Sequence, residues 1–349
     1  MSRSVTKSWS RTVHRLLYGL GVVLIVGLIV ETGPQTILKS LQDVNVWNLL
    51  WSQIAFTGIL LFGGFRWACL VKPVAPGASS GAIVGAHLSN SLLSGMTPAR
   101  TGEALAPLLM KERGGVPVSV GMAAILIDRI FDASALAAAM LYSAYHFAHS
   151  PRISTSSEIL SSELSVQALI LTLTLGALAI GVGIGVVLGM ARWLSGSLLS
   201  DSEEHLEDEP EHVSVARQTW SHFRGWVRGL ILAVGQAMST VGKPSIFAQL
   251  TVLTLATWAA QFVYTYFLIQ AFLPIRVDDS VACHTVSAAA GLLSMIPGGL
   301  GAATLGYVWA ADLLGYAWQP IASAGVVGLI LAYAMRLVAA MAADTWAGR

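Results

Sequence analysis

Eight long uncharged runs restrict what this chain can fold into. A helix that crosses a bilayer needs about 20 mostly apolar residues, and most of the runs reach that length. Because 55% of the residues are hydrophobic and 11% are charged, the composition excludes an ordinary soluble domain. The chain is therefore predicted to be an all-α integral membrane protein. The runs cover residues 16–30, 46–65, 77–99, 116–127 continued by 133–148, 164–191, 245–275, 280–311 and 313–335.

Two of these runs contain the same helix-breaking pattern. Met-x-Pro-x-x-x-Gly begins at Met96 and again at Met295, 199 residues later. Matching interruptions in the two halves of a membrane protein are typical of transporters built from inverted repeats, with the site where the interruptions meet. The flanking prolines keep nearly the same spacing, at offsets of 201 and 203: Pro73 and Pro274, then Pro117 and Pro320.

The basic residues predict that both interrupted segments are re-entrant hairpins, the first opening to the cytoplasm and the second to the outside. In this topology the outer loops hold only Lys39, Arg152 and Arg276, as the positive-inside rule requires. If both segments crossed the membrane, the basic loops at 111–113 and 192–243 would lie outside. We therefore expect two hairpins in an inverted repeat and about six spanning helices, near residues 16–31, 47–70, 117–148, 165–191, 246–273 and 320–345.

This topology divides the chain into six segments. The first apolar run lacks a small-x-small cleavage site, so it is expected to stay as an anchor in the cell membrane with its N-terminus in the cytoplasm. The segments are a basic N-terminus (1–15), a signal-anchor helix and outer loop (16–46), repeat 1 (47–148), an outer loop and spanning helix (149–199), an acidic linker with an interfacial helix (200–245), and repeat 2 (246–346).

Charged residues within the apolar segments are candidates for a binding site, because burying them in a membrane is costly. Asp128 and Asp132 are four residues apart and share a helix face, with Arg129 about 100° round the helix. A structural ion network is the alternative. The other charged candidates are Arg100 and Glu103 at the first break and Arg336 in the last helix.

Arg66 is left out of this set. It lies near the cytoplasmic end of its predicted helix, and a long basic side chain there is expected to snorkel to the membrane surface.

The second break carries no charge but is rich in glycine. Gly298, Gly299 and Gly301 free the backbone to point several N–H groups at one place, beside the start of the next helix. This geometry suits a phosphate or carboxylate, and Thr304 adds a hydroxyl. A plain tight turn at a hairpin tip is the alternative.

Other chemistries leave no signal. The sequence contains no nucleotide loop, zinc motif or nucleophile elbow, and Cys69 and Cys283 have no metal-ligand spacing. We expect no cofactor and no metal. The net charge of +1 argues against nucleic acid as a partner.

Three motifs together resemble the flippase-like membrane domain family, which includes the transmembrane part of bacterial lysylphosphatidylglycerol synthases. They are Pro98-x-Arg100-x-Gly102-Glu103 preceded by Asn90, Asp128-Arg129-x-x-Asp132, and Pro297-Gly298-Gly299-x-Gly301. The resemblance covers residues 16–345 and implies lipid translocation. The chain departs from the family at Ala106, Asp128 and Thr304, which changes the charge of the expected pocket. No soluble transferase domain is recognised, so lipid lysylation is not implied.

The leading hypothesis is a lipid transporter in which Arg100 holds an anionic headgroup and Arg129 exchanges partners between Asp128 and Asp132. A secondary transporter of a small soluble anion and a membrane-embedded lipid-modifying enzyme are the alternatives. The expected partners are phospholipids or polyprenyl-phosphate-linked lipids, with a lipid-modifying enzyme or a second copy of the chain as further candidates.

Overall fold

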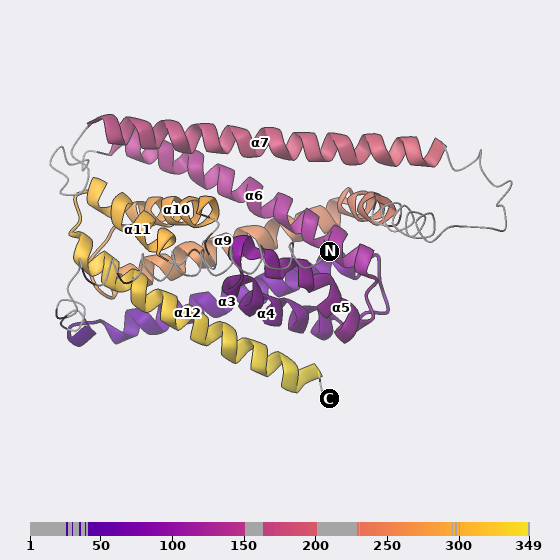
Figure 1. Ribbon diagram of the computed structural model, residues 1–349, viewed down its shortest axis with the longest axis horizontal. Helices are drawn as coiled ribbons and strands as arrows, with labels where there is room; N and C mark the ends of the chain where they lie inside the picture. The colour runs from indigo at the N-terminus through magenta and orange to yellow at the C-terminus, as the bar shows by residue number, and fades with distance from the viewer. Residues whose placement is uncertain are drawn as a thin grey trace, which may run out of the picture.

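The computed structural model describes residues 41–150, 163–200, 231–294 and 301–347 continuously, together with a few single positions. It omits the side chains of residues 98–100, 163–165, 187–188, 190–200 and 345–347. The described part contains helices and no strand (Figure 1). The elements are α3 (Val46–Val71), α4 (Ser80–Met96), η1 (Pro98–Leu105), α5 (Ala106–Gly114), α6 (Val118–His149), α7 (Glu163–Ser200), α9 (Pro244–Gln270), α10 (Val277–Leu293), α11 (Ala302–Leu313) and α12 (Trp318–Ala347).

An antiparallel pair of long helices, α3 and α9, lies at the centre of the described bundle. The start of α3 meets the end of α9, where the Asn45 amide donates to the Ala271 carbonyl at 2.9 Å. At the other end, Cys69 of α3 contacts Gln249 of α9, with 3.4 Å between Sγ and Oε1. The two contacts fix the antiparallel arrangement.

Each of two further segments folds as a helical hairpin. The end of α5 returns to the start of α4, and Gly114 lies beside Ala78 there. The loop after α11 likewise returns to the start of α10, where the Arg276 amide donates to the Tyr316 hydroxyl at 3.3 Å. The α4–α5 hairpin and the α10–α11 hairpin lie toward opposite ends of the long axis (Figure 1).

The helix that follows each hairpin packs against the other hairpin. Tyr333 of α12 donates its hydroxyl hydrogen to the Gly95 carbonyl of α4 at 2.5 Å. His146 of α6 lies 2.8 Å from Asp279 of α10. The two parts of the chain therefore interlock.

Four helices of the described part are long and apolar enough to cross a membrane: Val46–Val71, Val166–Val186, Pro244–Gln270 and Trp318–Asp344. The helix expected near 117–148 forms as α6, whose 32 residues extend about 48 Å. It carries Asp128, Arg129 and Asp132 in its first half and is not one of the four. The helix expected at 16–31 lies outside the described residues.

A short apolar helix, Ile231–Val241, precedes α9. Its Ala233, Val234 and Ala237 are buried in the core that contains Trp67 and Leu250. This stretch therefore packs against the bundle, whereas the charged part of the expected interfacial helix lies outside the described residues.

Candidate functional site

Five charged side chains from three elements form a connected network, here named the ion cluster: Arg66 of α3, Glu103 of η1, and Asp128, Arg129 and Asp132 of α6. Arg66 binds both aspartates, with 2.5 Å from Nε to Asp128 Oδ1 and 2.7 Å from Nη1 to Asp132 Oδ1. Arg129 Nη2 lies 2.6 Å from Asp128 Oδ2 and 3.2 Å from Asp132 Oδ2. Its Nη1 reaches Glu103 Oε1 at 3.6 Å.

Helical geometry brings the α6 members together. Asp128 and Asp132 are one turn apart on one face, and the long Arg129 side chain bends back across that face to reach both. The expected pairing of Arg129 with Asp128 or Asp132 is confirmed, and both pairs form at once.

Hydrogen bonds among the polar groups of the first break fix its conformation, and this positions Glu103. The Thr97 hydroxyl donates to the Leu93 carbonyl at 3.1 Å and accepts from the Gly102 amide at 2.6 Å. A Cβ on Gly102 would lie 2.8 Å from the Leu93 carbonyl carbon and oxygen. Only glycine allows η1 to approach α4 this closely, so Gly102 shapes the turn that carries Glu103.

Burial divides the ion cluster into a closed end and an open end. The side chains of Asp128 and Arg66 are 0% and 3% exposed. Those of Glu103, Asp132 and Arg129 are 19%, 25% and 35% exposed. Arg129 is therefore the more exposed arginine of the ion cluster, and Arg66 and Asp128 form its buried pair.

The prediction that Arg66 snorkels is wrong, because its side chain is buried and bound by two aspartates. It also lies 3.3 Å from the Thr254 hydroxyl of α9, measured from Nη1. The buried side of α3 offered a signal for this. Leu60, Gly63 and Arg66 follow one another at three-residue spacing on that side.

The charged candidate of the second half, Arg336, lies against the end of α4. Its Nη1 would be 3.0 Å from a Cβ on Gly95, and its Cζ is 5.5 Å from the ring centroids of Phe56 and Tyr333. Arg336 therefore contacts the first hairpin where the break begins. The first hairpin also buries Asn90, whose Oδ1 has no hydrogen-bond partner among the described groups.

The described glycines of the second break adopt left-handed conformations, with φ of 67° at Gly299 and 77° at Gly301. The Gly299 amide donates to the Ile296 carbonyl at 2.9 Å, as in a tight turn. Thr304 is buried against α12, since a Cβ on Gly325 would lie 2.3 Å from Thr304 Cγ2. An anion cradle here stays a prediction.

Several predicted site residues lie where the structure gives no side chain. Pro297 and Gly298 are outside the described residues, and the side chains of Pro98 and Arg100 are omitted. Their roles stay predictions.

Each half has one histidine at the eighth position of its first hairpin helix, and His284 is buried whereas His87 is partly buried. The His87 ring of α4 and the Trp67 ring of α3 are in a T-shaped, edge-to-face contact, with ring centroids 4.6 Å apart. His284 of α10 binds the Thr265 hydroxyl at 2.8 Å from Nδ1, and Tyr307 lies 3.2 Å from the same hydroxyl. Both histidines are packed against other side chains, and no described group of three or more acidic, histidine or cysteine side chains is placed to hold a metal.

The outward faces of the long helices are apolar. On α7, exposed leucines and valines recur from Leu171 to Val186, and α9 and α12 expose similar residues. Helices of this length with apolar outward faces are stable in lipid rather than in water, so the chain is a multi-pass helical membrane protein. It belongs to the family described as the lysylphosphatidylglycerol synthase TM region, whose model matches residues 16–340. This match confirms the resemblance seen in the motifs. A search of curated proteins found no match.

Proposed function

We propose that this protein moves lipids with polar or anionic headgroups between the two leaflets of the cell membrane. The observation that carries the proposal is the graded burial of the ion cluster, in which the Arg129 side chain is partly exposed while that of Asp128 is fully buried. Membership of a family described by a lipid-modifying synthase supports a lipid as the substrate.

In the proposed mechanism Arg129 changes partners. With no lipid bound, Asp128, Asp132 and Glu103 neutralise its charge. A headgroup phosphate offers the guanidinium a planar pair of oxygens, which is the geometry arginine binds best. Asp132 and Glu103 then face the headgroup and accept hydrogen bonds from its hydroxyl or amine groups. Arg66 keeps Asp128 in place throughout.

The cost of carrying a headgroup through the hydrocarbon core explains why the site needs several charges. An isolated ion in a low-dielectric interior is strongly disfavoured, whereas a network that always keeps each charge paired avoids that penalty. In this proposal Arg129 exchanges one anionic partner for another, so the site is never left with an unpaired buried charge.

We further propose that the two hairpin-containing halves are inverted repeats that move relative to each other about the central α3–α9 pair. In support, α9, α10, α11 and α12 begin 198, 197, 196 and 200 residues after α3, α4, α5 and α6. The packing of α12 on α4 and of α6 on α10 fits the same relation, because in each case the helix after one hairpin packs on the first helix of the other hairpin. Such an arrangement would open the site alternately to each leaflet.

The orientation is proposed from the basic residues. Lys72, Lys111, Arg113 and Lys243 lie at the ends of helices that meet around the mouth of the α4–α5 hairpin, with Arg113 Nη1 3.3 Å from a Cβ placed on Gly85. This end is assigned to the cytoplasm by the positive-inside rule. The α10–α11 hairpin then opens to the outside.

Translocation of headgroup-labelled phospholipid in proteoliposomes tests the function. We expect wild-type protein to expose inner-leaflet label to a membrane-impermeant quencher, and Arg129→Ala and Arg100→Ala to abolish this. Arg276→Ala is the matched control, since Arg276 is an exposed arginine that pairs with Asp278, itself about half exposed. If Arg129→Ala and Arg100→Ala both moved lipid at the wild-type rate, the site assignment would be wrong. Uptake of a soluble anion without lipid movement would favour a secondary transporter.

A further inference from the structure

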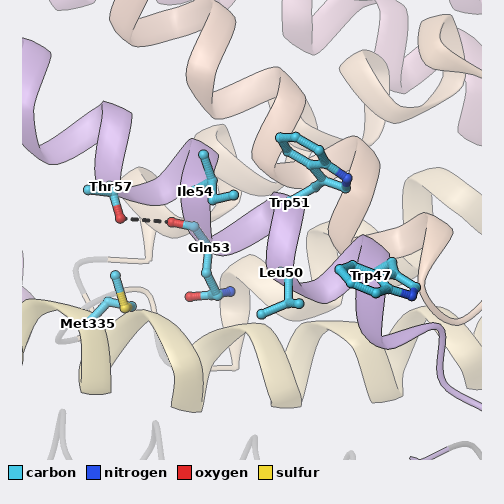
Figure 2. A pocket seen from close by; sticks show the side chains of 7 residues that line it. All are labelled: Trp47, Leu50, Trp51, Gln53, Ile54, Thr57 and Met335. Atoms are coloured by element: carbon cyan, nitrogen blue, oxygen red, sulfur yellow. Dashed lines mark hydrogen bonds between the residues drawn. The ribbon is translucent and has the colours of Figure 1, made fainter.

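An apolar groove with a volume of about 360 Å³ runs along the first half of α3, beside α12 (Figure 2). Trp47, Leu50, Trp51 and Ile54 form most of its wall, and Met335 of α12 faces them. We propose that this groove binds one acyl chain of a membrane lipid. The binding stands by itself, whereas its part in transport rests on the proposed function.

The surroundings of the groove select the occupant. Both α3 and α12 are apolar enough to cross a membrane, and Leu50, Trp51 and Ile54 are exposed on the outward surface. In a bilayer this surface meets lipid hydrocarbon. A concave apolar surface of this kind is filled by the flexible chain of a neighbouring lipid.

The length of the groove matches one leaflet. From Trp47 to Thr57 the helix rises about 15 Å, at 1.5 Å per residue. The hydrocarbon core of a bilayer is about 30 Å thick, so the groove extends over about half of it. Trp47 lies one residue after the start of α3, and tryptophan is enriched at the membrane surface. The groove therefore runs from the surface toward the bilayer centre.

The polar atoms of the groove are either hydrogen-bonded within the protein or buried, which favours a chain over a headgroup. The Thr57 hydroxyl donates to the Gln53 carbonyl at 2.9 Å. The Gln53 side chain points toward α12 (Figure 2), and its amide nitrogen donates to the Ser52 hydroxyl at 3.0 Å. Its Oε1 is buried and so is not presented to a ligand.

The inner end of the groove adjoins the first hairpin break. Met335 is followed by Arg336, whose guanidinium lies beside Phe56 of α3 and Gly95 of α4. Beyond Gly95 the chain enters η1, which carries Glu103 of the ion cluster. A lipid whose chain occupies the groove would thus have its polar part guided along α3 toward the break, while its chain stays in contact with the bilayer.

Photocrosslinking tests the binding. Full-length protein is reconstituted in phosphatidylcholine liposomes with a trace of phosphatidylcholine that carries a diazirine on its acyl chain, and adducts are mapped by peptide mass spectrometry. We expect labelling of residues 47–57 to exceed by several-fold that of Val252 and Leu255, which are similarly exposed on α9 but do not line this groove. Equal labelling at both places would overturn the proposal. Crosslinks between two copies of the chain at α3, in place of lipid adducts, would also overturn it.

A groove-filling variant links binding to transport. Ile54→Trp should reduce labelling of the groove several-fold and slow lipid translocation, whereas Leu255→Trp should change neither. Size-exclusion profiles and melting temperatures check that both variants fold. If Ile54→Trp does not fold, Leu50→Trp replaces it as the groove-filling variant. If the wild-type protein showed enriched labelling but moved no lipid, the proposed function would be refuted, and the proposal that the groove binds an acyl chain would stand. Translocation without enriched labelling would refute the groove alone.

Discussion

Arg66 Nε in α3 lies 2.5 Å from Asp128 Oδ1 in α6, and neither side chain is more than 3% exposed. The pair joins two helices through residues that are 62 positions apart in the chain. Asp128 uses its other oxygen for Arg129, so a single carboxylate connects a sealed arginine to an accessible one. This connection separates a part of the ion cluster that holds the helices together from a part that can exchange partners.

The sealed pair should matter mainly for stability. Arg66→Leu would leave Asp128, Asp132 and Glu103 with Arg129 as their one shared cation in the ion cluster, and breaking a buried pair typically costs about 3–5 kcal/mol. We expect a large fall in melting temperature in detergent. The double variant Arg66→Leu, Asp128→Leu should recover part of the loss, because no charge remains unpaired. Breaking the Arg113–Asp344 pair, whose carboxylate is largely exposed, is the control and should cost less than about 1 kcal/mol. A single variant as stable as the wild type would contradict the role given to Arg66.

The accessible arginine should matter mainly for transport. Arg129→Lys keeps the charge but loses the planar pair of donors that a phosphate binds. We expect lipid translocation to fall several-fold while the melting temperature changes little. Unfolding and translocation are measured on the same reconstituted sample. If stability fell in parallel with transport, Arg129 would be a structural residue like Arg66.

The first break should be intolerant of any side chain at Gly102. A Cβ there would lie 2.8 Å from the Leu93 backbone and from the Thr97 hydroxyl oxygen, so η1 would have to move away from α4. Overpacking of this kind costs about 1–3 kcal/mol. Gly102→Ala should lower both stability and translocation, because Glu103 moves with the turn. Gly77→Ala is the control, since a Cβ on Gly77 would meet nothing within 4 Å. Equal behaviour of the two variants would show that the close approach at Gly102 is unimportant.

Local patterns predicted much of this arrangement, and distant contacts were the part they could not reach. Spacing within α6 was enough to place Arg129 between Asp128 and Asp132, because all three positions belong to one helix. Arg66 lies five residues before the end of α3, and from that position its side chain can either snorkel to the membrane surface or be buried in the protein. Its partners lie on another helix, so only the three-dimensional packing decides between these outcomes.

The same limit applies to the second half and to the groove. Thr304 was expected beside an anion, yet the absence of a side chain at Gly325 lets it pack into α12. The groove depends on α3 meeting Met335, which is more than 270 residues away in the chain. Apolar runs identify each helix, but all outward faces look alike until the helices are assembled.

The opposed hairpins give a prediction about topology. Glu112 on α5 and Ala317 before α12 are exposed near the mouths of the two hairpins, which lie toward opposite ends of the molecule (Figure 1). In a background without Cys69 and Cys283, we expect Glu112→Cys to react with a membrane-impermeant maleimide only from the cytoplasmic side and Ala317→Cys only from the outside. Gln42→Cys, just before α3, is the control and should react from the same side as Ala317→Cys, because the start of α3 meets the end of α9. Labelling of residues 112 and 317 from one side would rule out hairpins that enter from opposite faces, and with them the inverted arrangement on which alternating access depends.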